Sequence, residues 1–184
     1  MWFTDAGAGE GAVYRCDPMF GRSVWVEPVS ADLEQPTGIH FEPGHERVYI
    51  ADAGQQHRIG AFDVTDDNTL SAVRMWMDGS AARMCCDRHG NLYAARRDGV
   101  RIFSPSGVKL ATVALPEPPT DCALGGKSRD QLFVTAGGSL YRAPLKKVGA
   151  PVPAAWEGRR VKQDPYLLVQ ESKRPVQKKK ENQR

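Results

Sequence analysis

Tyr49-Ile50-Ala51-Asp52-Ala53-Gly54 is the stretch that decides the fold, because variants of it recur along the 184-residue chain. The same pattern of an aromatic residue followed by small or branched residues begins at Trp2 and, more weakly, at Tyr93 and Phe133. The steps between the four aromatic residues are 47, 44 and 40 residues (2 to 49, 49 to 93 and 93 to 133). A drifting period of roughly 40–50 residues built from short strands is typical of β-propeller blades.

The residues around each repeat predict antiparallel strands separated by tight turns. Runs rich in β-branched and aromatic residues alternate with turn residues such as Glu42–His45 and Asp66–Asn68. The predicted strands are Trp2–Thr4, Ala12–Cys16, Val24–Val29, Thr37–Phe41, Arg47–Ala51, His57–Val64, Leu70–Met77, Arg83–Asp87, Leu92–Arg96, Val100–Phe103, Val108–Ala114, Asp121–Leu124, Gln131–Thr135 and Leu140–Ala143. The first blade lacks an inner strand. We therefore predict an all-β partial propeller of about three and a half four-stranded antiparallel blades.

The charge balance divides the chain in two. Residues 1–145 carry 14 basic and 18 acidic side chains, whereas residues 146–184 carry 11 basic and 4 acidic ones. Pro151-Val152-Pro153 interrupts any strand, and Lys173–Arg184 is almost wholly charged or polar. We predict a partial propeller at 1–149 and a basic, disordered tail at 150–184. The tail is compatible with an acidic surface as a partner. Its lysines have no aromatic ladder beside them, so nucleic acid is not the expected partner.

The sequence predicts neither a membrane span nor an N-terminal signal peptide. No apolar run approaches ~20 residues, so no membrane span is expected. The N-terminus has no signal-peptide pattern, which favours a cytoplasmic protein. Because Met1–Asp5 resembles the middle of a strand, we expect preceding blades to be missing. Open blade edges then predict self-association.

The four cysteines show no metal-binding or redox spacing. Cys85 and Cys86 are adjacent and point to opposite faces of a strand, while Cys16 and Cys122 stand alone. Buried reduced thiols are the better interpretation than a disulfide framework.

Several phrases occur in an order that resembles a known family. They are Phe3-Thr4-Asp5, Gly11–Pro18, Gln35–Ile39, Arg47–Gly54, Asp87–Tyr93 and Cys122–Gly126. Together they resemble the SMP-30/gluconolactonase/regucalcin family over residues 1–149. The resemblance implies a six-bladed propeller that holds a divalent metal, calcium or zinc, at one end of its channel. It also implies hydrolysis of sugar lactones, in which the metal polarises the lactone carbonyl and activates a water molecule.

The resemblance implies three metal ligands, of which this chain keeps little. A Glu near the start of the full family chain has no counterpart here. The family's Asn before Gly corresponds to Thr37, a poorer ligand, and its Asp corresponds to Ala82, which cannot ligate. Arg83 replaces a small Gly and brings a positive charge to the site. Asp121 takes the corresponding place in the fourth blade.

Four residues therefore become candidates for the end of the channel. Thr37, Ala82, Arg83 and Asp121 are the candidates for facing the channel or a substrate, and Thr37 and Asp121 are the candidate metal ligands. No catalytic residue is assigned, since no serine has a His–Asp arrangement beside it.

Other polar residues have simpler interpretations. Asp5 and Asp52 each precede a glycine at a strand end, which favours turn stabilisation over ligation. His57 is interpreted as a packing residue.

Three functions stay open on this evidence. The first is a metal-dependent lactone hydrolase, an activity that the substitutions at Thr37, Ala82 and Arg83 weaken or abolish. The second is a non-catalytic propeller module that binds a partner. The third is binding of nucleic acid or an acidic surface through the tail.

Overall fold

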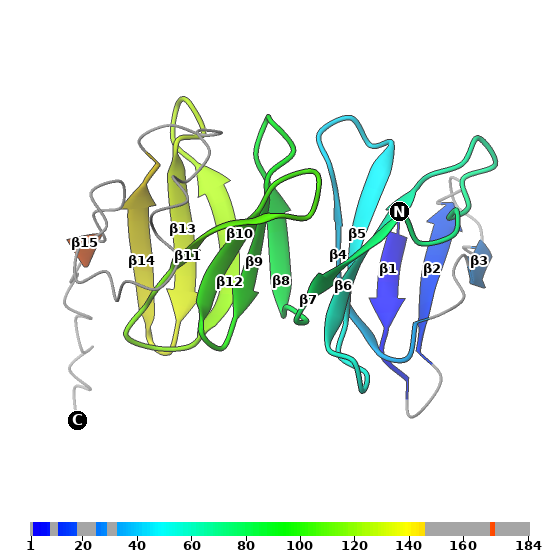
Figure 1. The fold of residues 1–184 in the computed structure, drawn as a ribbon, viewed down its shortest axis with the longest axis horizontal. Helices are drawn as coiled ribbons and strands as arrows, with labels where there is room; N and C mark the ends of the chain where they lie inside the picture. Colours follow the sequence, from blue (N-terminus) through cyan, green and yellow to red (C-terminus); the bar gives the residue numbers. More distant parts are fainter. Residues whose placement is uncertain (1, 8–10, 18–24, 29–32, 146–169, 172–184) are drawn as a thin grey trace, which may run out of the picture.

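The structure, a computed structural model, describes residues 2–7, 11–17, 25–28, 33–145 and 170–171. Its elements are β-strands arranged as one three-stranded and three four-stranded sheets (Figure 1). They are β1 (Trp2–Asp5), β2 (Ala12–Asp17), β3 (Trp25–Pro28), β4 (Pro36–Phe41), β5 (Arg47–Asp52), β6 (Arg58–Asp63), β7 (Met75–Asp78), β8 (Arg83–Cys86), β9 (Leu92–Arg96), β10 (Gly99–Phe103), β11 (Lys109–Val113), β12 (Pro119–Gly125), β13 (Gln131–Ala136), β14 (Ser139–Pro144) and β15 (Gln170–Glu171).

Each sheet is an antiparallel meander that follows chain order. We call them sheet 1 (β1-β2-β3), sheet 2 (β4-β5-β6-β7), sheet 3 (β8-β9-β10-β11) and sheet 4 (β12-β13-β14-β15). Figure 1 shows them side by side from the blue N-terminal sheet to the yellow one. The predicted all-β blades are confirmed, and β1 forms an edge of sheet 1 because the described residues include no inner strand for it.

Thirteen of the fourteen predicted strands are correct within two residues at each end, and one is not. The outer strand of sheet 2 is β7, which begins at Met75 rather than at Leu70. Leu70 instead forms an isolated bridge with Val64, and the amide of Ser71 donates to the carbonyl of Asp63 at 3.0 Å. The chain therefore folds back on the end of β6 before it starts the outer strand.

The basic tail lies outside the described residues except for Gln170 and Glu171. These two residues form β15 and pair with Arg142 and Tyr141 of β14. The predicted disorder of the rest of the tail lies outside the described residues. Without β15 the backbone groups of β14 would be a free sheet edge, and any extended segment can pair with such an edge.

The core consists of three layers of side chains between successive sheets. Side chains alternate across a strand, so neighbouring residues of one central strand enter different layers. On β5, Ile50 packs towards sheet 1 with Val13, while Tyr49 and Ala51 pack towards sheet 3. A further layer between sheets 3 and 4 includes Tyr93 and Tyr141. The central strands are thus buried on both faces, as blades of a propeller must be.

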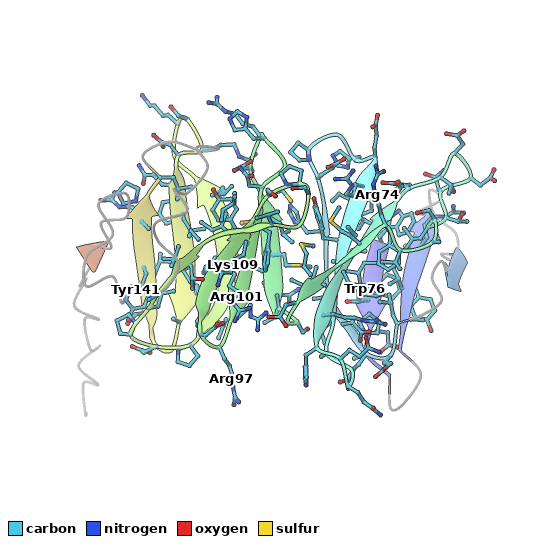
Figure 2. All side chains as sticks on the ribbon, in the orientation of Figure 1. Arg74, Trp76, Arg97, Arg101, Lys109 and Tyr141 are labelled. Carbon is cyan, nitrogen blue, oxygen red and sulfur yellow. The ribbon has the colours of Figure 1, made fainter. Side chains whose placement is uncertain are left out.

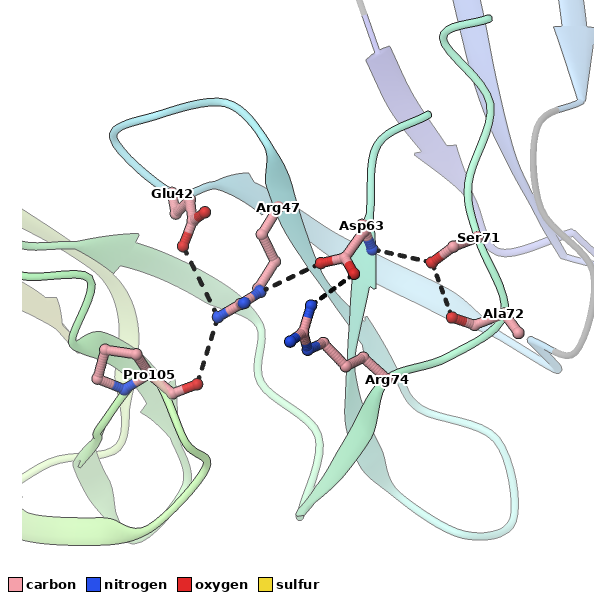
Figure 3. A network of polar contacts seen from close by, with 7 residues as sticks. All are labelled: Glu42, Arg47, Asp63, Ser71, Ala72, Arg74 and Pro105. Atoms are coloured by element: carbon pink, nitrogen blue, oxygen red, sulfur yellow. Dashed lines mark hydrogen bonds and ion pairs between the residues drawn. The ribbon is translucent and has the colours of Figure 1, made fainter. Parts of the chain in front are cut away.

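A polar network also joins sheets 2 and 3 (Figure 3). Arg47 Nη1 donates to the carbonyl of Pro105 at 3.3 Å, and its Nε lies 3.5 Å from Asp63 Oδ1. Asp63 in turn pairs with Arg74 at 2.7 Å. Arg47 is the first residue of β5, so this network lies at the end of the sheets opposite to the start of β4. The site predicted from the sequence lies at the start of β4.

The described residues contain no helix that is long and apolar enough to cross a membrane. All four cysteines are buried and have free thiols, as the sequence predicts.

Candidate functional site at the start of the inner strands

The inner strands of sheets 2, 3 and 4 lie next to one another. β4 packs beside β8, and β8 packs beside β12. Each inner strand begins at the same end, because each sheet is a meander of the same direction. Residues at the start of these strands therefore share one end of the molecule.

Strand register shows which residues occupy equivalent places. The repeated aromatic residues Tyr49, Tyr93 and Phe133 pair with His40, Cys85 and Ala123 of their inner strands. Three residues before these partners stand Thr37, Ala82 and Thr120. Thr37 and Ala82 are therefore matched, as predicted, but the matched residue in sheet 4 is Thr120, and Asp121 lies one residue further along.

The same β-bulge occurs at the start of β4 and of β12, and it supports the match between Thr37 and Thr120. The register shifts between Pro36 and Gly38 in β4 and between Pro119 and Asp121 in β12. The extra residue in each strand is a threonine that follows a proline. The Oγ1 of Thr37 lies 3.4 Å from the carbonyl oxygen of Ala51, and that of Thr120 donates to the carbonyl oxygen of Thr135 at 3.1 Å. Both hydroxyls thus satisfy the backbone at the bulge.

The matched positions supply few metal-binding atoms. The single hydroxyl proton of Thr37 is shared between the carbonyl oxygens of Ala51 and of Ala81, which lies 3.5 Å away. Ala82 offers a methyl group, and its amide donates to the carbonyl of Ala95 at 3.1 Å. One hydroxyl without a carboxylate or amide oxygen does not fit a divalent cation, which prefers several oxygen ligands. Nowhere in the described ranges do three or more His, Cys, Asp or Glu residues form a group that could hold a metal ion.

Arg83 and Asp121 are both exposed at this end of the molecule. Met84 packs against sheet 2 and Cys85 against sheet 4, so alternation puts Arg83 on the side of β8 that faces sheet 4. Its guanidinium has no partner among the described residues. Asp121 lies on the opposite face of β12 from the buried Cys122, whose amide donates to Asp121 Oδ1 at 2.7 Å.

Other arginines at this end are more constrained. Arg101 pairs with Asp98 at 2.6 Å and with Asp78 at 3.1 Å, and Arg96 donates to the carbonyl of Asp78 at 2.8 Å. Arg97 extends away from the sheets into solvent (Figure 2). Of these cations, Arg83 is the one that combines a free guanidinium with a place on an inner strand.

Asp5 and Asp52 have the turn-stabilising role that the sequence predicts. Asp5 Oδ1 accepts from the amide of Gly7 at 3.0 Å, and Asp52 Oδ1 accepts from that of Gly54 at 3.1 Å. The buried Asp52 also accepts from the amide of Gln35 at 2.7 Å, which fixes the segment leading into β4.

A cavity of about 330 Å³ lies beside these turns. It is lined by Ala6, Glu34, Gln35, Ala53, Gly54, Gln55 and His57. Gln35 leads into β4 and Gly54 follows β5, so the cavity lies at the same end as Thr37. His57 is exposed on its wall with a φ of 44°, so the interpretation of His57 as a packing residue is wrong. Its backbone conformation follows from a turn in which its amide donates to the carbonyl of Gly54 at 3.0 Å.

The sequence did not reveal a buried carboxylate at the other end of sheet 3. Asp87 accepts hydrogen bonds from the amides of His89 and Asn91 at 2.8 and 3.0 Å, and from Asn91 Nδ2 at 2.8 Å. The hydroxyl of Tyr93 also donates to it at 3.3 Å. Burial, followed by the charge of Asp87, raises the pKa of Tyr93. The Asp-Arg-His-Gly-Asn turn was the available signal, but its role is structural.

Comparison with known proteins relates this arrangement to one family. Residues 1–138 match the SMP-30/Gluconolactonase/LRE-like region. The chain belongs to this family. The resemblance carried by the repeated phrases is therefore confirmed.

Two curated relatives have names that describe lactone chemistry. The gluconolactonase of Zymomonas mobilis is 25% identical over 136 residues, which cover 66% of this chain and 38% of that protein. The lactonohydrolase oryH of Aspergillus oryzae is 24% identical over 167 residues, which cover 76% of this chain and 35% of that protein. The chain thus spans less than half the length of these relatives.

Solved structures agree with the fold. A gluconolactonase from Xanthomonas campestris superimposes with a TM-score of 0.66 at 27% identity, over 78% of this chain and 52% of that one. A calcium-binding regucalcin from Agrobacterium tumefaciens superimposes with a TM-score of 0.57 at 21% identity, over 72% of this chain and 46% of that one. The second likeness shows the fold alone.

Proposed function

We propose that this chain forms the sugar-lactone-binding end of a gluconolactonase-type propeller in which metal-dependent hydrolysis is greatly weakened. Family membership and the relatives named for lactone hydrolysis support the substrate class. The proposed loss of hydrolysis rests on Thr37 and Ala82. These residues occupy matched register positions at which the resemblance implies Asn and Asp. Losing ligands from a three-residue set costs orders of magnitude in metal affinity.

Binding of a lactone or its open acid does not require those ligands. The free guanidinium of Arg83 is a donor for a lactone carbonyl or an aldonate carboxylate. The second oxygen of Asp121 and the wall residues Gln35 and Gln55 can accept or donate to sugar hydroxyls at the same end. Charge and hydrogen-bonding groups therefore remain where metal ligands have been replaced.

Restoring the ligands tests the proposal. The triple variant T37N/A82D/R83G returns the amide and carboxylate oxygens and removes the positive charge. We expect calorimetry to detect saturable Ca²⁺ or Zn²⁺ binding in the variant but not in the unaltered chain. Hydrolysis of glucono-δ-lactone should rise at least about tenfold above the spontaneous and unaltered rates. The variant T112N/A114D/R97G is a matched control, because it makes the same three kinds of change at exposed positions outside the inner strands.

A measurement on the unaltered chain can contradict the proposed loss of hydrolysis. Saturable binding of Ca²⁺ at millimolar concentration or below, together with lactone hydrolysis that EDTA abolishes, would show that another ligand set operates. The loss of hydrolysis would then be refuted.

The second candidate is a non-catalytic module that binds a partner through its open sheet face. Leu140 on β14 is 52% exposed, and the neighbouring Phe133 is half-buried on the same sheet. Gluconate binding by calorimetry separates the two candidates. Binding that R83A removes supports the lactone site, whereas its absence in the unaltered chain favours the module.

A further inference from the structure

We propose that Cys85 and Cys122 are an oxidisable pair whose disulfide links sheet 3 covalently to sheet 4. The two sulfur atoms lie 3.8 Å apart, across the boundary between the inner strands β8 and β12. Both residues are buried, with 8% and 5% of their surface exposed. The proposal is independent of lactone binding, since neither residue belongs to the matched row at Thr37 and Ala82.

The strand register explains why these two side chains meet. Cys85 pairs with Tyr93 in sheet 3, just as His40 pairs with Tyr49 in sheet 2. Cys85 and His40 therefore occupy the same position of their inner strands, and each faces the next sheet. His40 reaches across its own boundary in the same way, where its Nε2 accepts from the amide of Cys86 at 3.1 Å. Cys122 faces back towards sheet 3, and its sulfur also lies 3.6 Å from the carbonyl oxygen of Tyr93. The contact is therefore built by the blade geometry and belongs to the packed layer that contains both cysteines.

The side chain of the neighbouring Cys86 points to the opposite face of β8, away from this pair. Cys86 packs with Tyr49 and Leu92 in the layer between sheets 2 and 3, on the other face of β8. Burial raises its pKa to about 12. The structure thus distinguishes two adjacent cysteines that look equivalent in the sequence, and it selects Cys85.

Forming the bond needs a small movement and an oxidant. A disulfide has an S–S length of about 2.0 Å, so the sulfurs must approach by roughly 1.8 Å through side-chain rotation and a slight shift of the sheets. With a diazenedicarboxamide (diamide), one thiol adds across the N=N bond to give a sulfenyl hydrazine. The second thiolate attacks that sulfur, the S–S bond forms, and the hydrazine leaves with both protons and both electrons. Hydrogen bonding to Cys122, with burial, raises the pKa of Cys85, so we expect a slow reaction limited by opening of the layer.

Oxidation should stabilise the fold, because it closes a loop between residues 37 positions apart. The thermal unfolding midpoint of the oxidised chain should rise by roughly 5–10 °C. Treatment with dithiothreitol should return it to the original value.

The test uses the full chain treated with diamide while folded, then unfolded and labelled with N-ethylmaleimide. The reduced chain has four cysteines and should take up four labels, whereas the oxidised chain should take up two. Trypsin should release the peptide Met84–Arg88 joined to Leu110–Lys127, and fragmentation between Cys85 and Cys86 identifies the linked residue. The variant C86S should form the same link and show the same rise in midpoint. C85S and C122S should lose both.

Two results would overturn the proposal. One is a folded chain that keeps four reactive thiols after prolonged oxidation but forms links once it is unfolded. The other is a link through Cys86 or Cys16. Because the unaltered chain alone can give either result, the test stands even if a serine variant fails to fold.

Discussion

Asp87 is a buried residue whose carboxylate is fully hydrogen-bonded within the fold. It accepts four hydrogen bonds while only 3% of its surface is exposed. Removing the carboxylate would leave buried donors without partners, which costs far more than losing an exposed charge. We predict that D87A lowers the free energy of unfolding by about 2–4 kcal/mol in urea titrations. The control D66A, at an exposed turn, should change it by no more than about 0.5 kcal/mol. Equal effects of both variants would contradict the assigned role.

His40 should make stability depend on pH. Burial, with smaller contributions from Arg129 and His45, lowers its pKa in the folded state below the usual 6.5. The neutral ring accepts from the amide of Cys86, and a protonated ring cannot. Its contribution is therefore fully present above pH 6.5, and it is lost as the pH falls through the lower folded-state pKa. We expect urea unfolding between pH 7.5 and 5 to show this loss, of about 1 kcal/mol.

The variant H40Q isolates this effect, because glutamine keeps an acceptor but does not titrate. It should flatten the pH dependence, while H57Q, at an exposed histidine, should leave the slope unchanged. A slope that persists in H40Q would assign the dependence to other groups.

Single residues also show where sequence reasoning reached its limit. Asp5 and Asp52 were predicted as turn residues because their contacts are local, and local contacts follow from neighbouring residues. Asp121 was predicted to be the residue of sheet 4 that matches Thr37 and Ala82, but the strand register matches Thr120 with them. The repeated dipeptides Pro36-Thr37 and Pro119-Thr120 were the available signal, but the pairing of β12 with β13 was needed to establish the match.

At the scale of the strands, the turn between β9 and β10 requires glycine. Gly99 has a φ of 129°, and a Cβ there would lie 2.3 Å from the backbone oxygen of Val113. Backbone cannot move aside as a flexible side chain can. We predict that G99A destabilises the fold by more than about 2 kcal/mol in chemical unfolding. The matched control is G44A, since a Cβ at Gly44 meets nothing within 4 Å and should be nearly neutral. A stable G99A variant would show that the turn has another conformation.

The strands themselves were the most predictable elements, for a physical reason. Alternation and turn residues act within a few positions, so both ends of β5 and β9 follow from the sequence. The outer strand β7 was predicted to begin too early because Leu70 and Val73 resemble strand residues. In the structure they precede β7 and pack against the layer that contains Phe62 of β6. Pairing of β15 with β14 joins residues 28 or more positions apart, and no local pattern encodes such a pairing.

At the scale of the whole molecule, sheet 3 couples its neighbours, because its two faces contribute to two different core layers. Met84 enters the layer shared with sheet 2, and Cys85 enters the layer shared with sheet 4. In repeat architectures the stability of each unit depends on such interfaces with its neighbours. We predict that M84A leaves a cavity and lowers stability by about 2–4 kcal/mol. Its loss should appear in hydrogen exchange of both β5 and β9, although only β9 belongs to the mutated sheet.

The exposed Leu140 supplies the matched control for this coupling. L140A removes a similar apolar side chain from a surface position that is 52% exposed, and it should leave the exchange of β5 and β9 unchanged. If M84A instead accelerates exchange in β9 alone, sheet 2 is stable without its neighbour, and the blades unfold as separate units. Faster exchange that reaches β5 and β9 together would show that the layers of apolar side chains make these sheets one cooperative structure.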